Sequence, residues 1–154
     1  MRRILVTGMS GTGKSTALAE LARRGFQVVD TDDGPWSEWS EADGGYVWRE
    51  DLVAELLSRD EGETLYVSGT MSNQGRFYPR FDAVVLLSAP VDVLLRRVEA
   101  RTTNSYGRTA EERALILRHA AEVEPLLRDT CTHEIDAAQP IGDVVAQLAE
   151  IGRS

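Results

Sequence analysis

The sequence lacks a second cysteine, an excess of positive charge and a long hydrophobic run. With Cys131 as its only thiol, the chain can form neither an internal disulfide nor a cysteine-rich zinc site. Its 17 Lys and Arg residues against 25 Asp and Glu residues give a net charge of -8, the wrong sign for a protein that follows a nucleic-acid backbone. The apolar run behind Met1-Arg2-Arg3 stops at Thr7-Gly8, which is too short for a signal segment or a membrane span. We therefore expect a soluble, cytoplasmic protein with neither a nucleic-acid polymer nor a membrane among its partners.

What the sequence does contain is an alternation of short apolar segments and amphipathic helical patterns. The expected strands cover residues 3–7, 26–29, 65–67, 83–87 and, more weakly, 132–135. The expected helices cover residues 14–24, 50–58, 91–100, 110–127 and 141–151. This alternation implies an α/β fold with parallel strands joined by right-handed crossovers. A chain of 154 residues has room for one such domain, residues 1–154.

The stretch GMSGTGKST follows the first expected strand and opens the first expected helix. It fits the Walker A pattern G-x-x-x-x-G-K-[ST], in which glycines let successive backbone N–H groups point at the phosphates of a nucleotide. Lys14 is expected to reach the β- and γ-phosphates, and the Ser15 hydroxyl to bind Mg²⁺. Thr16 either lies near the α-phosphate or caps the helix. The expected nucleotide-binding residues here are Gly8, Ser10, Gly11, Thr12, Gly13, Lys14, Ser15 and Thr16.

Two absences narrow the choice of nucleotide and reaction. The chain has no Asn-Lys-x-Asp string of the kind that reads guanine, so ATP is favoured. Its third strand ends in LYVSGTMSN without the acidic pair that ATP-driven motors use to position water. Transfer of a phosphoryl group to another molecule is therefore favoured over hydrolysis.

Carboxylates appear instead behind the second strand, in VVDTDDGPW. Asp30 and Asp32 alternate off the strand end, at the edge of the sheet where the phosphate loop also lies. One is expected to hold Mg²⁺ and the other to accept the proton of an attacking hydroxyl. Because Asp30 still belongs to the strand end, we assign Asp30 to the metal and Asp32 to the acceptor, with Asp33 solvated.

The phosphate loop, the DTD string, an arginine-rich segment at residues 97–108 and the final EIDAAQPIGDVVAQLAEI resemble the small P-loop kinases of the shikimate kinase, gluconate kinase and adenylate kinase superfamily. The resemblance implies a P-loop NTPase fold with a five-stranded parallel sheet in the order 2-3-1-4-5 and helices on both faces. It also implies an acceptor-binding cap at about 33–60 and a lid at about 101–110. The turn 136–140, with Gln139 and Pro140, is expected to pack against adenine, and Arg97 to contact the nucleotide.

Departures from the shikimate kinase pattern bear on the acceptor. Ser68-Gly69-Thr70 stands where shikimate kinases carry three glycines, and Glu124-Pro125-Leu126-Leu127 where they carry an arginine ahead of Pro-Leu-Tyr. Since a like charge would replace a partner for a substrate carboxylate, shikimate itself is disfavoured. The stretches NQGRFYPRFDAVVLL and RTTNSYGR look closer to gluconate kinases and small adenylate kinases, between which the sequence does not choose.

The acceptor site is expected to draw on two segments. All three tryptophans, Trp36, Trp39 and Trp48, follow the aspartates within a short span. They either form the core of a small helical cap or stack on a ring of the acceptor, and the two readings are equally supported. Ser68, Gly69 and Thr70 are expected to face acceptor hydroxyls from the end of the third strand.

The expected lid has arginines that could stabilise the negative charge of the transferring phosphoryl group. Gly107 and small polar residues lie between two helices, so the segment either closes over the γ-phosphate or is an ordinary connecting loop. In the first case Arg101 and Arg108 meet the charge that develops during transfer. His119 and His133 show no metal-ligand spacing and are expected to be structural or exposed.

Two functions remain open at this point. The first is a kinase that moves the γ-phosphoryl group of Mg·ATP to a hydroxyl or phosphate of a small metabolite or nucleotide and releases ADP. The second is a nucleotide-binding switch or slow ATPase that acts through a protein partner.

Overall fold

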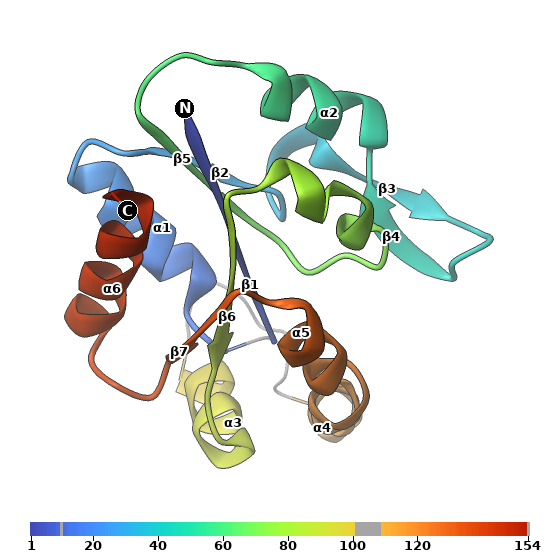
Figure 1. Cartoon of the computed structure of the whole chain (residues 1–154). Coiled ribbons are helices and arrows are strands. Elements are labelled where there is room, and N and C mark those ends of the chain that lie inside the picture. Colours follow the sequence, from blue (N-terminus) through green and yellow to red (C-terminus); the bar gives the residue numbers. More distant parts are fainter. Residues whose placement is uncertain (10, 101–108, 154) are drawn as a thin grey trace.

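A five-stranded parallel sheet forms the centre of the protein (Figure 1). The computed structural model describes residues 1–9, 11–100 and 109–153. The strands follow the order β2-β5-β1-β6-β7. They are β1 (Arg2–Gly8), β2 (Gln27–Asp30), β5 (Thr64–Ser68), β6 (Ala83–Ser88) and β7 (His133–Asp136). Counted along the chain, this is the expected order 2-3-1-4-5.

Alternation of side chains along the central strands builds a core on each face of the sheet. On one face, Ile4 and Val6 pack with apolar residues of α1 (Lys14–Arg23) and α6 (Ile141–Arg153). On the other, Leu5 and Val67 pack with residues of α2 (Glu50–Ser58) and the 3₁₀ helix η2 (Gln74–Arg80). The sheet is therefore covered on both sides, as the apolar strands predict.

Three more helices complete the order of the chain. They are α3 (Val91–Ala100), α4 (Ala110–Glu122) and α5 (Glu124–Thr130). The expected single helix over 110–127 is therefore wrong. Pro125 lacks an N–H and its ring clashes with the carbonyl one turn earlier, so the chain breaks at Val123 and starts a new helix.

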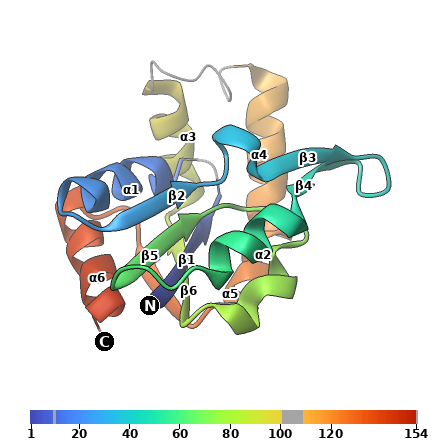
Figure 2. The same cartoon turned by 90° about the horizontal axis from the view of Figure 1, so that it is seen from above.

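A β-hairpin replaces the helical cap that the clustered tryptophans suggested. After the short 3₁₀ helix η1 (Gly34–Trp36), strands β3 (Ser37–Ser40) and β4 (Gly45–Trp48) pair antiparallel and project from the body of the molecule (Figure 2). The polar turn between them contains Gly44 at φ 66°, a conformation that glycine adopts without strain. Alternating residues around this turn favour a hairpin over a helix.

Two helices lie at the carboxyl ends of the parallel strands. Helices α3 and α4 both lie beyond the end of β1, and the Arg113–Glu99 ion pair of 2.8 Å ties α4 to α3 (Figures 1 and 2). Within the described residues, no helix is long and apolar enough to cross a membrane.

Candidate active site

The phosphate loop connects β1 to α1 and depends on glycines for its path. Gly8 has φ +153° and Gly11 has φ +88°, where other residues are strained. A Cβ at Gly8 would lie 2.4 Å from the Leu87 carbonyl oxygen, and one at Gly11 2.8 Å from that of Leu94. The loop therefore packs against the end of β6 and against α3 so closely that side chains are excluded at both points. Ser10, expected to bind nucleotide, lies outside the described residues.

Lys14 is held over this loop at the start of α1. Its ammonium donates hydrogen bonds to the carbonyl oxygens of Gly8 at 2.7 Å and Met9 at 3.3 Å. The buried Thr12 hydroxyl donates to the same Met9 carbonyl at 2.8 Å, which closes the loop into a tight turn. Gly13 occupies the N-cap position of α1, and the exposed Thr16 lies inside the helix, so Thr16 is not its cap.

Asp30 joins three elements at the edge of the sheet. Its Oδ2 accepts a hydrogen bond of 2.7 Å from the Ser15 hydroxyl, and its Oδ1 one of 3.1 Å from the Ser68 hydroxyl. The Asp32 backbone N–H also donates to Oδ1, at 3.1 Å. Ser68 is fully buried at the end of β5, so the prediction that it faces the acceptor is corrected. Its hydroxyl orients Asp30 instead.

Asp32 lines a cavity of about 180 Å³ next to the phosphate loop. The described lining residues come from the phosphate loop and the start of α1, the segments that follow β2 and β5, and helix α4; they are Gly8, Met9, Lys14, Asp32, Thr70, Ile116 and His119. Neighbouring protein atoms remove part of the water around the Asp32 carboxyl and raise its pKa, an effect that Lys14 opposes and that Asp30 and Asp33 reinforce. A carboxylate of raised proton affinity beside a lysine suits a proton acceptor.

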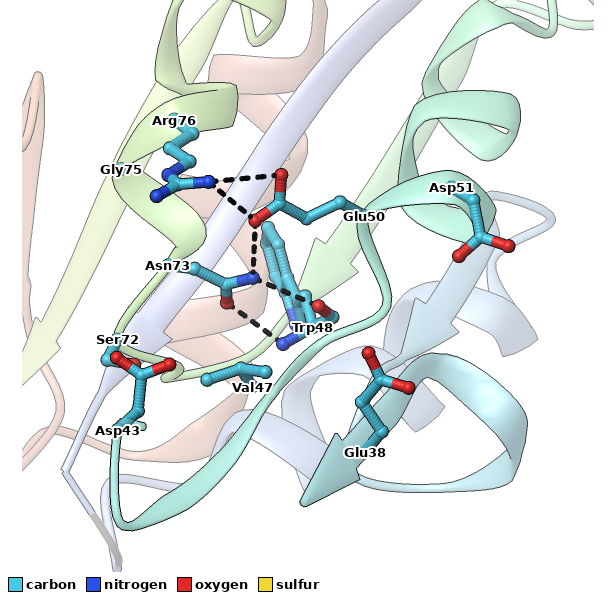
Figure 3. Close-up of a pocket in the computed structure, with 10 residues that line it drawn as sticks. All are labelled: Glu38, Asp43, Val47, Trp48, Glu50, Asp51, Ser72, Asn73, Gly75 and Arg76. Atoms are coloured by element: carbon cyan, nitrogen blue, oxygen red, sulfur yellow. Dashed lines mark hydrogen bonds and ion pairs between the residues drawn. The ribbon is translucent and has the colours of Figure 1, made fainter. Parts of the chain in front are cut away.

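A second, larger hollow of about 620 Å³ lies under the cap. Its charged lining residues are Glu38, Asp43, Glu50, Asp51 and Arg76, and it shares no lining residue with the Asp32 cavity. Asn73 pins the hairpin here, because its side chain accepts from Trp48 N at 2.9 Å and donates to Trp48 O at 2.9 Å (Figure 3). Since acidic groups outnumber the single arginine, this hollow disfavours an anionic ligand.

Comparison with known proteins fits this geometry. A family model described as an AAA domain matches residues 4–118. Shikimate kinase 2 of Escherichia fergusonii is 30% identical over 94% of this chain and 88% of its own length. The solved shikimate kinase of Bacteroides thetaiotaomicron shares the fold, with a TM-score of 0.70 at 20% identity over 99% of both chains. A gluconokinase structure from Sinorhizobium meliloti gives a TM-score of 0.65 at 23% identity, over 99% of this chain and 92% of that one.

The chain belongs to the small P-loop kinases of the shikimate kinase type. Membership makes it a small-molecule kinase, and its kinase relatives imply the use of ATP. The sequence motifs that carried the resemblance are therefore confirmed at the level of the family.

The tryptophans of the kinase separate into different roles. Trp48 is 1% exposed, donates its indole N–H to the Thr31 hydroxyl at 2.9 Å and packs edge-on against Phe77. The prediction that it stacks on an acceptor is corrected, because a ring so deeply buried has no face left for a ligand. Trp36 is half-buried against the same core. Trp39 is 53% exposed and packs edge-on against Tyr46 across the hairpin, so it remains a candidate contact.

Gly69 and Thr70 also differ in what they do. A Cβ at Gly69 would lie 2.4 Å from the Thr31 hydroxyl and 3.1 Å from the Trp48 ring, so its small size permits close packing against both residues. Thr70 lines the Asp32 cavity and donates its hydroxyl to the Gly8 carbonyl oxygen at 2.7 Å. Thr70 is thus the member of this segment that lies at the predicted site of transfer.

The residues expected to bind nucleotide come together from distant parts of the sequence. Arg97 of α3 donates to the Gly11 carbonyl oxygen at 3.4 Å. The side chain of Ile141 comes within 4.0 Å of a Cβ placed at Gly13. Ile141 directly follows Gln139 and Pro140, so the turn expected to meet adenine lies beside the start of α1. Arg101 and Arg108, expected in the lid, lie outside the described residues.

Two features of the site escaped the sequence analysis. His119 is exposed, in agreement with the expectation that it is structural or exposed, but its place with Ile116 in the lining of the Asp32 cavity was not predicted. Glu124 lines neither the Asp32 cavity nor the hollow under the cap, and instead pairs with Arg128 at 2.8 Å. For His119, the signal was its spacing of three residues from Ile116, which places both side chains on one helix face.

Proposed function

We propose that this kinase transfers the γ-phosphoryl group of Mg·ATP to a hydroxyl or phosphate group of a small metabolite or nucleotide. The observation that supports it best is the joint lining of one cavity by Lys14, Asp32 and Thr70. A phosphate-binding lysine, a carboxylate with a raised pKa and a hydroxyl stand around a space of about 180 Å³. This is the combination that in-line transfer to an acceptor requires.

The residues around Asp30 fit a magnesium ion. The Ser15 hydroxyl and the Asp30 carboxylate supply two oxygen ligands, and Mg²⁺ in such sites keeps water and substrate phosphates as its other ligands. Bound Mg²⁺ would neutralise phosphate charge during transfer. Ser68 holds Asp30 in place from the opposite side.

Each side chain then has a distinct part in the proposed reaction. The loop N–H groups and the N-terminus of α1 bind the phosphates. Lys14 leaves the loop carbonyls and follows the transferring group, while Asp32 accepts the proton of the attacking hydroxyl. The proton moves to a carboxylate oxygen of Asp32, the new bond forms between the acceptor oxygen and phosphorus, and the bond to the ADP oxygen breaks.

The proposal is tested by incubating the protein with Mg·ATP and a broad set of sugars, sugar acids, nucleosides, nucleotides and antibiotics. We expect one class of acceptor to accelerate ADP release and to gain the mass of one phosphoryl group. Asp32→Asn serves as the control for contaminating kinases, because it should lose this activity. An ADP release rate that no acceptor changes, and that an added protein partner raises, would instead indicate a nucleotide switch.

A further inference from the structure

One face of α4 is directed at the phosphate loop. Ile116 is 2% exposed, and Val123, seven residues later, packs against the small core around Met9 and Leu127. His119 lies between them, three residues after Ile116 and four before Val123, so all three project from the same side of the helix. Helix geometry therefore presents an imidazole among the side chains that pack toward Met9.

The position of α4 is fixed at its start. Thr109 and Glu112 form a reciprocal capping box, in which the Glu112 N–H donates to the Thr109 hydroxyl at 3.1 Å. Arg113 adds the ion pair to Glu99 of α3. A helix tied at its first turn and buried through Ile116 holds His119 in a defined place at the cavity wall.

Few of the described residues that line the Asp32 cavity carry a hydrogen-bond donor. Among these described side chains, donors at neutral pH are carried by Lys14, Thr70 and His119. Thr70 already gives its hydroxyl proton to the Gly8 carbonyl oxygen. The His119 side chain is exposed. Its ring makes no hydrogen bond to another described residue. Among the described lining residues, Lys14 and His119 are therefore the donors suited to an incoming phosphoryl group.

The charged side chains of the cavity favour the phosphoryl group and the acceptor hydroxyl at different places. The Asp32 carboxylate repels phosphoryl oxygens and attracts the proton of an acceptor hydroxyl. A phosphoryl group entering beside Lys14 is directed away from Asp32 and toward the other donor among the described lining residues, the imidazole of His119. The two donors come from different elements, Lys14 from the start of α1 and His119 from α4.

We propose that His119 donates a hydrogen bond to the phosphoryl group during transfer, as a second contact beside Lys14. The inference rests on the proposed function and adds a residue to it. Such a donor meets charge that the transferring group carries and that the diphosphate product lacks. His119 should therefore affect turnover more than it affects ADP affinity.

A matched pair of variants separates this role from a structural one. His119→Gln should lower the rate of ADP release, with the acceptor from the library screen, by about tenfold or more, as expected for the loss of a hydrogen bond to a charged group. Its KM for ATP should stay within about threefold, because a contact made mainly in the transition state leaves ground-state binding intact. His133→Gln, in β7, should match the wild type in both constants. A His119→Gln variant that raises KM without lowering kcat would overturn the proposal.

The direct test uses the two histidines as reporters, since the chain contains only His119 and His133. Imidazole proton and carbon resonances are recorded in the free protein, with Mg·ADP, and with Mg and the ATP analogue that has an imido bridge between its β- and γ-phosphates. The His119 resonance should shift with the analogue but not with Mg·ADP, and the His133 resonance should stay in place throughout. His119→Gln assigns the signals.

Calorimetry on the same samples distinguishes a failure of the proposed function from a failure of the His119 inference alone. If the analogue releases no binding heat, the nucleotide site and the proposed function both fail. If it binds but the His119 resonance does not move, or moves equally with Mg·ADP, the inference about His119 alone is wrong.

Discussion

The Ser15 hydroxyl donates a hydrogen bond of 2.7 Å to the Asp30 carboxylate and so joins the first turn of α1 to the end of β2. The residues are fifteen positions apart, and the parallel sheet brings them together because both segments meet its carboxyl edge. In the proposed function, this hydroxyl and carboxylate in direct contact are a pair of oxygen ligands that is in place before Mg²⁺ binds. Ser68 supports the pair from β5.

Asp30→Asn should raise the Mg²⁺ concentration needed for half-maximal activity by about tenfold or more, since it removes the charge from a ligand of the ion. The value is read from initial rates over a magnesium titration at saturating ATP. Asp33→Asn is the matched control, because its carboxylate accepts no hydrogen bond from Ser15 or Ser68. An unchanged requirement in Asp30→Asn would remove Asp30 from the metal site.

Asp32→Asn should abolish acceptor phosphorylation and leave Mg·ATP affinity within about threefold, because a lost proton acceptor weakens the transition state and not the ground state. The wild-type rate should also fall on the acid side at a pH above 3.8, the ordinary value for an aspartate, since the pKa of Asp32 is raised. The sign follows from the base role: the ionised form works above the folded-state pKa and is lost as pH falls through it. A pH profile of kcat at saturating substrates tests this. Rescue of Asp32→Asn by high Mg²⁺ would exchange the roles of Asp30 and Asp32.

Trp48→Phe should lower the free energy of unfolding by about 1–3 kcal/mol, because it removes a buried hydrogen bond to Thr31 and leaves space in the core. Trp39→Phe changes an exposed ring and should stay within about 0.5 kcal/mol. Urea denaturation curves of both variants supply the comparison. Equal stability losses would mean that the exposed hairpin pair of Trp39 and Tyr46 contributes as much as the buried ring.

The sequence predicted those parts of the fold that depend on patterns among neighbouring residues. Apolar runs located the five parallel strands, and glycines followed by Lys14 located the phosphate loop, because both patterns depend on neighbouring residues. The hairpin was missed because the three clustered tryptophans suggested the core of a helical cap. The turn at Gly44 is the feature that indicates a hairpin. The break at Val123 was missed although Pro125 marks it.

Pairings between distant residues were beyond the sequence. Nothing near Ser68 shows that its hydroxyl is directed at Asp30, since this depends on the register between β2 and β5. Likewise, the place of His119 in the lining of the Asp32 cavity depends on how α4 packs across the end of the sheet. Such contacts follow from tertiary packing, which local propensity does not encode.

The central claim is that the loop between β1 and α1 presents Lys14 to a phosphoryl group that is being transferred. The most direct measurement is the turnover of Lys14→Ala with Mg·ATP and the acceptor from the library screen, with circular dichroism to verify the fold. Lys14 is the only lysine in the chain, so no other lysine can take its place. The account predicts a loss of about two or more orders of magnitude in kcat with the fold intact. Near-normal turnover in a folded Lys14→Ala variant would contradict it.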